Sequence, residues 1–142
     1  MSDPLADRCR RLIEVGFGQG DLSVLDDLMT DDIVEHQRGN PSGRDGAKAI
    51  VRTLHRWMSD FSLTVQDLAV SGDVVWTRNV ARGVNTGSVM GHAASGTLVE
   101  VDVIDILRFA DGRAVEHWGI ADQLGLLIQV GALPAPGRPA GG

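Results

Sequence analysis

The sequence contains no tyrosine, only one cysteine, and just 4% aromatic residues. A single cysteine excludes an intrachain disulfide, and Cys9 has no zinc-ligand partner at a suitable spacing. Cys9 falls among Leu5, Leu12 and Ile13 in a helical pattern, so we expect it to be a small buried hydrophobic side chain. No pair among the four histidines has the spacing of metal ligands, and the sequence therefore predicts no metal site.

An excess of basic residues is also missing, because the formal net charge is -6. The only basic cluster, Arg8–Arg11, has acidic neighbours and is typical of a solvated helix face, so binding to nucleic acid is disfavoured. No apolar run approaches the roughly 20 residues that a membrane span needs. The first residues, MSDPLADRCRR, lack the apolar stretch of a signal peptide, and we expect a cytoplasmic protein with no membrane partner.

Length and composition fit one domain with one core, since 43% of the 142 residues are hydrophobic. We expect a single domain over residues 1–132 and a flexible tail rich in proline and glycine over residues 133–142. Apolar residues recur at helical spacing from Pro4 to Phe17, from Leu22 to Met29 and from Ala47 to Met58, which predicts three helices. The aspartates that precede the first two segments are suited to cap them.

After the third helix the apolar period changes from helix to strand. Four strands are predicted: Phe61–Val70, Val74–Thr86, Thr97–Phe109 and Arg113–Ala121. A short strand at Ile33–His36 leads into a glycine-rich loop, Gly39–Gly46, and Gln123–Val130 predicts a closing helical turn. Helices followed by a long curved antiparallel sheet indicate an α+β fold, in which the sheet wraps around the helices as a cone with a central hydrophobic cavity.

The last hairpin places an acid next to a histidine. If the turn is the three-residue loop Ala110–Gly112, Asp105 and His117 lie directly opposite each other, with β-carbons about 5 Å apart. Their face of the hairpin is otherwise apolar and is expected to be interior. A two-residue loop would shift the register by one and place Asp105 opposite Trp118 instead.

A carboxylate beside an imidazole in a poorly solvated hollow fixes the tautomer of the ring and raises its basicity. Such a pair can carry out general acid–base chemistry, although a structural pair that closes a strand end is the alternative interpretation. His36, which ends a strand beside the glycine-rich loop, is the second catalytic candidate.

Several large side chains are candidates to line the cavity and bind a substrate, and ordinary core packing is the alternative for each. They are Phe17, Trp57, Trp76, Arg78 and Met90. Trp76 and Arg78 alternate along one strand and so share a face. If that face is interior, Arg78 needs a carboxylate, and Asp105 is the obvious one.

Five segments together resemble the SnoaL-like polyketide cyclases, which have the nuclear-transport-factor-2-like, or ketosteroid-isomerase-like, cone fold. The segments are GRDG (43–46), SGDVVWTR (71–78), GVNTG (83–87), DILRFADGRAVEHW (105–118) and LGLLIQVG (124–131). The resemblance covers nearly the whole chain except the tail. This fold also hosts isomerases, hydroxylases, epoxide hydrolases and plain binding proteins.

The resemblance implies a cofactor-free pocket for a hydrophobic, polyketide-like carbonyl compound. In these cyclases a proton leaves an acidic carbon and an intramolecular aldol addition closes a ring. His117 matches the family's histidine, and Gly119 stands where the family carries its proton-handling aspartate and would leave room there. His36 falls where the ketosteroid isomerases carry their general-base aspartate, and the lack of tyrosine removes the oxyanion device of those isomerases.

Three hypotheses follow. In the first, the protein is a cyclase in which His117, positioned by Asp105, is the general base or acid, His36 is a second proton site across the cavity, and a developing enolate is stabilised by Arg78 or by protonated His36. In the second, it is an epoxide-opening or hydroxylase-type relative that uses the Asp105–Arg78 pair. In the third, it binds a small molecule without catalysis.

An apolar patch is expected on the outer face of the last two strands. Ile104, Ile106 and Trp118 point away from the face that carries Asp105 and His117. Because half-bare sheets tend to pair, this patch predicts a homodimer through the outer face of the sheet.

Overall fold

The computed structural model describes residues 3–137 and confirms an α+β fold. The helices are α1 (Pro4–Arg11), the π-helix η1 (Leu12–Gly18), α2 (Leu22–Leu28), α3 (Gly43–Trp57) and α4 (Gln123–Gln129). The strands are β1 (Met29–Glu35), β2 (Met58–Ser71), β3 (Val74–Asn85), β4 (Leu98–Ala110) and β5 (Arg113–Ala121).

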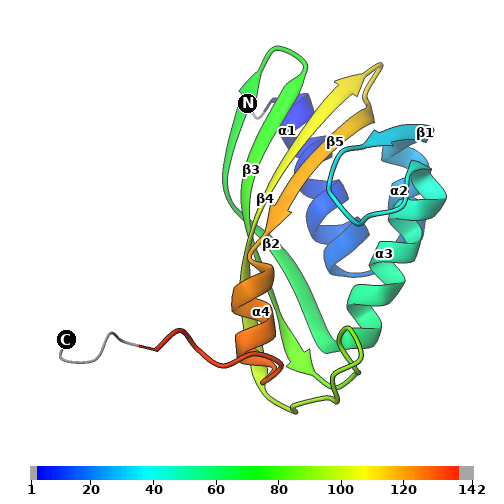
Figure 1. Ribbon diagram of the computed structural model, residues 1–142. Helices are drawn as coiled ribbons and strands as arrows, with labels where there is room; N and C mark the ends of the chain where they lie inside the picture. The colour runs from blue at the N-terminus through cyan, green and yellow to red at the C-terminus, as the bar shows by residue number, and fades with distance from the viewer. Residues whose placement is uncertain (1–2, 138–142) are drawn as a thin grey trace.

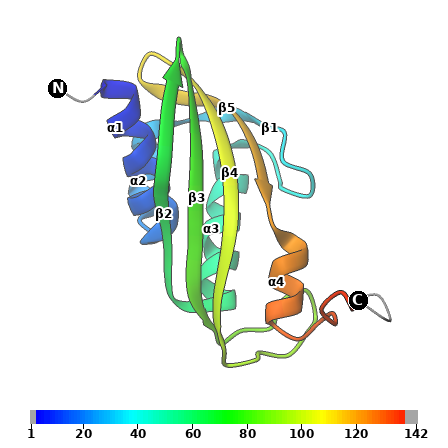
Figure 2. The ribbon, with the colours of Figure 1, turned by 90° about the vertical axis from the view of Figure 1, so that its left-hand side faces the viewer.

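The five strands form one open, mixed sheet in the order β1-β5-β4-β3-β2. β1 runs parallel to β5, and all other neighbours are antiparallel. The sheet curves around α1, α2 and α3, which cover one of its faces, and α4 lies at the end of β5 (Figure 1; Figure 2). This is the predicted cone, with its hollow between the helices and the concave face of the sheet.

The first two helices begin where the sequence predicts. The side chain of Asp3 accepts a hydrogen bond from the backbone of Leu5, and that of Asp21 accepts one from Ser23, so each satisfies a backbone N–H that the helix leaves free. The single helix expected from Pro4 to Phe17 widens into a π-helix at Leu12, a form that often occurs near functional sites.

Two boundaries differ from the prediction. α3 begins at Gly43, inside the expected loop. Gly46 therefore belongs to the helix and not to a turn, and its missing side chain allows close packing, since a β-carbon there would lie 2.5 Å from the carbonyl oxygen of Pro41. β1 begins at Met29, since it is held by parallel pairing with β5. That pairing joins segments about eighty residues apart, and local sequence patterns carry no sign of it.

The expected register of the last hairpin is wrong, although the face it predicts is right. The turn has two residues, Asp111 and Gly112, both with positive φ (51° and 78°), as a type I′ turn requires. A bulge after the turn leaves Val115 unpaired. The net effect is an even shift, which places Asp105 opposite Gly119, two residues beyond His117, and keeps both Asp105 and His117 on the inner face.

Apolar side chains form a core between the helices and the sheet. Cys9, Leu12, Leu25, Val75 and Val99 have no exposed surface, which confirms Cys9 as a core residue. Within residues 3–137, no helix is long and apolar enough to cross a membrane.

The tail is described only in part. Residues 134–137 form neither helix nor strand, and residues 138–142 lie outside the described range. The division into one domain and a flexible tail therefore stays a prediction.

The convex face of the sheet carries the expected apolar patch. Ile104 lies opposite Ile120, and Ile106 lies between Trp118 and Trp76 on the neighbouring strands. Ile120 is 76% exposed and Trp76 51% exposed, and none of the helices in the described part of the chain lies over this face (Figure 2).

We predict that this patch pairs two copies of the chain, because burying it would remove large apolar side chains from water. Sedimentation at micromolar concentration should give a dimer for the wild type and a monomer for the double variant Ile104→Asp/Ile120→Asp. Leu124→Asp, which changes a side chain on α4 that is 55% exposed, should stay dimeric. A monomeric wild type would contradict the prediction.

Candidate active site

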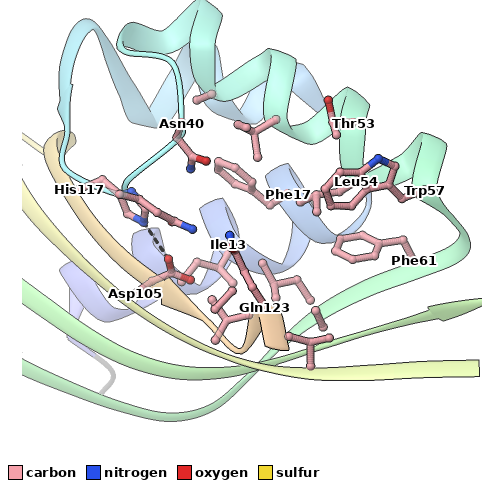
Figure 3. A pocket seen from close by; sticks show the side chains of 18 of the residues that line it. Ile13, Phe17, Asn40, Thr53, Leu54, Trp57, Phe61, Asp105, His117 and Gln123 are labelled. Carbon is pink, nitrogen blue, oxygen red and sulfur yellow. Dashed lines mark hydrogen bonds and ion pairs between the residues drawn. The ribbon is translucent and has the colours of Figure 1, made fainter. Parts of the chain in front are cut away.

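A cavity lies between the concave face of the sheet and the helices. The space open to the centres of water molecules is about 190 Å³, and most of its wall is apolar. Apolar side chains from the helices, the strands and the loop before β4 line it: Ile13, Phe17, Leu54, Trp57, Phe61 and Met90 (Figure 3). Phe17, Trp57 and Met90 thus line the cavity, and their expected role in binding a substrate stays a prediction.

The other two expected lining residues lie outside the cavity. Trp76 is exposed on the convex face, and Arg78 forms an exposed ion pair with Asp67, with 2.6 Å between Nη2 and Oδ2. The reason is the alternation of β3, whose inward positions are taken by Val75, Thr77 and Asn79. The possible pair of Arg78 with Asp105 does not form.

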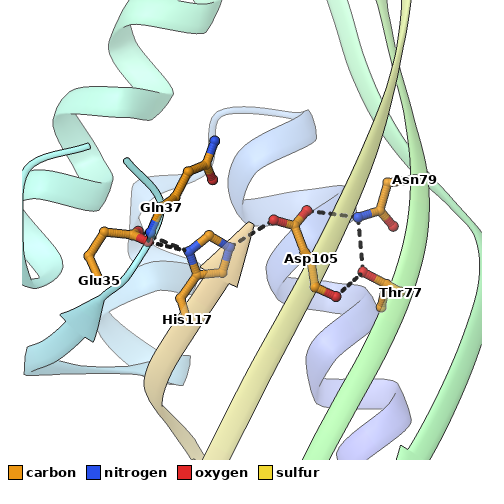
Figure 4. Close-up of polar contacts among 6 residues, drawn as sticks. All are labelled: Glu35, Gln37, Thr77, Asn79, Asp105 and His117. Atoms are coloured by element: carbon orange, nitrogen blue, oxygen red, sulfur yellow. Dashed lines mark hydrogen bonds and ion pairs between the residues drawn. The ribbon is translucent and has the colours of Figure 1, made fainter. Parts of the chain in front are cut away.

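One end of the cavity is polar, and there His117 lies between two carboxylates (Figure 4). Its Nε2 is 2.7 Å from Oδ1 of Asp105. Its Nδ1 is 2.7 Å from Oε1 and 2.9 Å from Oε2 of Glu35. The three side chains are only 12–15% exposed. The structure thus brings Asp105 and His117 together as expected and adds an acid that the sequence analysis did not propose.

Each member of this triad comes from a different strand. Glu35 on β1 is the parallel neighbour of His117 on β5, and Asp105 reaches His117 diagonally from β4. Both ring nitrogens therefore face a carboxylate oxygen.

This arrangement favours the protonated form of His117. Burial by itself would lower the pKa of His117, but the hydrogen bonds and negative charges of Asp105 and Glu35 outweigh it and raise the pKa from 6.5 to about 9. At neutral pH the ring is an imidazolium with a proton on each nitrogen.

Further hydrogen bonds orient the two acids. The side-chain amide of Asn79 donates to Oδ2 of Asp105 (2.8 Å) and to Oγ1 of Thr77 (2.9 Å), and that hydroxyl donates to the backbone carbonyl of Asp105. The backbone N–H of Gln37 donates to Oε1 of Glu35. Neither Thr77 nor Asn79 is among the residues that the sequence predicts for the site. Their signal is that they are polar and alternate with Val75 on the same face of the strand.

His36 does not face the cavity, so its expected role as a second proton site across the hollow is wrong. Its ring stacks on Trp118, with centroids 4.8 Å apart, and its Nε2 lies 2.6 Å from Oε2 of Glu116. Because side chains alternate along a strand, the neighbour that faces inward is Glu35. The residue that lines the cavity is therefore Glu35, one position before the expected His36.

Gly119 does not leave free space either. A β-carbon at this position would collide with Oε1 of Gln37 and would lie 2.9 Å from both Oδ1 of Asp105 and Cε1 of His117. The volume that an aspartate would need here is already filled by the side chains of the site.

Comparison with known proteins identifies the family. The family model of the SnoaL-like polyketide cyclases matches residues 7–130. The chain belongs to this family. Among curated proteins, no sequence matches the chain.

Solved structures of similar sequence have the same fold. TsrD from Streptomyces laurentii is 32% identical, with 91% of this chain and 93% of TsrD covered and a TM-score of 0.79. IdmH from Streptomyces antibioticus, a proposed polyketide cyclase, is 34% identical, with 92% and 99% covered and a TM-score of 0.79. AclR from Streptomyces galilaeus, a proposed hydroxylase, is 25% identical, with 94% and 85% covered and a TM-score of 0.83.

We predict that the triad makes the stability of this family member depend on pH. A pKa that folding raises stabilises the protein fully below the unfolded value, and this stabilisation is lost as the pH rises through the folded value. For His117 the interval runs from 6.5 to about 9. Urea denaturation should show that the free energy of unfolding falls as the pH rises from 6.5 to about 9.

The variant His117→Gln should flatten this dependence, because glutamine does not titrate. It should also be less stable than the wild type at the low end of the interval, since the two carboxylates lose the cation between them. An equally steep decline in the variant would exclude His117 as its source.

Proposed function

We propose that this SnoaL-like protein is a cofactor-independent cyclase that closes a ring within a hydrophobic, polyketide-type carbonyl substrate by general acid–base catalysis. The observation that carries the proposal is an apolar cavity with one polar end, where an imidazolium lies between two carboxylates. The apolar wall suits a carbon skeleton, and the triad offers both a proton acceptor and a positive charge.

Asp105 has more free hydrogen-bonding positions than Glu35. Each carboxylate has about four lone-pair positions for hydrogen bonds. Glu35 accepts from its neighbour's backbone N–H and contacts the ring with both oxygens, whereas Asp105 accepts from His117 and from one side-chain amide. Three of these positions on Glu35 and two on Asp105 are thus in contact with protein groups, and we assign the role of proton acceptor to Asp105, which has more positions open to a substrate.

His117 is then the acid of the site, since neither ring nitrogen has a free lone pair. This revises the sequence-based hypothesis, in which His117 could be either base or acid. Its positive charge stabilises the enolate that forms when Asp105 removes a proton from the carbon next to a carbonyl. The enolate carbon bonds to a second carbonyl of the same molecule, and the new alkoxide takes back one proton from the site, which returns to its starting state.

The epoxide-opening alternative loses its basis, because it required Asp105 to pair with Arg78, and Arg78 pairs with Asp67 on the outer surface. A hydroxylase-type reaction has support only from the likeness to AclR. Binding without catalysis remains the competing proposal of another class and predicts saturable uptake of a carbonyl compound with no chemistry on it.

We predict that the protein exchanges the acidic hydrogens of 2-tetralone, a hydrophobic ketone, for deuterium in D₂O. Proton NMR follows the exchange. Asp105→Asn should lower the rate by about 100-fold or more, because general acid–base groups contribute roughly 10²–10⁴-fold. His117→Gln should lower it by a similar factor, since the enolate loses its nearest positive charge.

His36→Gln is the matched control, as it makes the same change in a histidine outside the cavity, and it should exchange at the wild-type rate. Circular dichroism shows whether each variant is folded. Wild-type rates in folded Asp105→Asn and His117→Gln would rule out this mechanism. Saturable binding of 2-tetralone with no exchange by the wild type would favour the binding protein.

A further inference from the structure

Two carboxamide side chains line the polar end of the cavity and are not used by the triad. Gln37 and Asn40 are both half-buried, and both belong to the loop between β1 and α3 (Figure 3). Within residues 3–137, neither side-chain amide makes a hydrogen bond to another protein group. Among the described residues, none satisfies these hydrogen-bonding groups, which leaves them available to a ligand in the cavity that both side chains line.

A tight turn connects the two residues. The backbone N–H of Asn40 donates to the carbonyl of Gln37 (3.2 Å), and Gly39 between them has φ of +89°, which suits glycine. The backbone N–H of Gln37 donates to Glu35, so the turn is tied directly to the triad. The backbone of the turn that carries both residues is thus anchored to the acid of the triad.

Gly119 provides the space that Gln37 occupies. The side-chain oxygen of Gln37 packs where a β-carbon of residue 119 would be, next to Asp105 and the ring of His117 (Figure 4). A larger residue at position 119 would push the amide of Gln37 away from the triad.

We propose that Gln37, together with Asn40, binds an oxygen atom of the ligand, a carbonyl or hydroxyl group carried by a flat hydrophobic skeleton. Amides taken out of water without a partner cost free energy, which a ligand oxygen recovers and a ligand without that oxygen does not. The pair therefore selects oxygenated compounds over hydrocarbons of the same shape. This inference rests on the proposed function in one respect: the proposed function identifies the bound oxygen as the atom that becomes the enolate oxygen.

The binding of the oxygen would also direct the chemistry. An oxygen held beside Gln37 puts the carbon next to its carbonyl within the part of the cavity that Asp105 and His117 line. The amide N–H groups would then share the developing negative charge with the imidazolium, as preorganised donors do in other enzymes.

Binding of two matched probes tests the proposal without any turnover. 2-Naphthol resembles the enol of 2-tetralone, and 2-methylnaphthalene has the same shape but cannot hydrogen-bond through oxygen. NMR titration at pH 7 should give the wild type about 10-fold tighter binding of 2-naphthol, the effect expected of one or two hydrogen bonds. Gln37→Leu should reduce this preference to about twofold or less and leave the affinity for 2-methylnaphthalene nearly unchanged.

Two further variants separate the amide from its surroundings. Gly119→Ala keeps every hydrogen-bonding group but places a β-carbon against Gln37 first and against Asp105 and His117 less closely, and it should lose the preference as Gln37→Leu does. Gln66→Leu makes the same substitution at an exposed position on β2 and should keep the wild-type preference.

The proposal is overturned if folded Gln37→Leu and Asn40→Leu both keep the full preference, or if the wild type binds the two probes equally or not at all. Its failure is distinct from failure of the proposed function. A wild type that prefers 2-naphthol but exchanges no deuterium into 2-tetralone would keep the oxygen-binding site and remove the cyclase.

Discussion

The contact on which the site depends is a buried imidazole held between two carboxylates. A lone charge in an apolar hollow is costly, and two acids on one buried ring tolerate each other only while a cation separates them. His117 supplies that cation, with its pKa raised to about 9, and the hydrogen bonds from Gln37 and Asn79 hold Glu35 and Asp105 in position.

The architecture explains how three strands meet at this point. The parallel addition of β1 at the edge of β5 brings Glu35 beside His117, and the bulge after the last turn moves Asp105 to a diagonal position without changing its face. Chemistry at one end and an apolar wall elsewhere are the direct result of which strand positions point inward.

Local patterns in the sequence predicted the fold class, the helix caps and the partnership of Asp105 with His117, because alternation and turn residues act over short distances. They failed where long-range pairing decides. Nothing near Glu35 shows that β1 joins β5, so His36 was chosen in place of its neighbour. Likewise, only Thr77 and Asn79 indicate in the sequence which face of β3 points inward. The expectation that Trp76 lines the cavity is wrong, because Trp76 lies on the opposite face of the strand.

The most direct test of the account is the protonation state of His117 at neutral pH. Nitrogen-15 NMR of the ring, assigned by comparison with His117→Gln, reports each nitrogen separately. The account predicts that Nδ1 and Nε2 both carry a hydrogen and give imidazolium shifts that do not change until the pH approaches 9. A neutral ring at pH 7, with one nitrogen unprotonated, would contradict it.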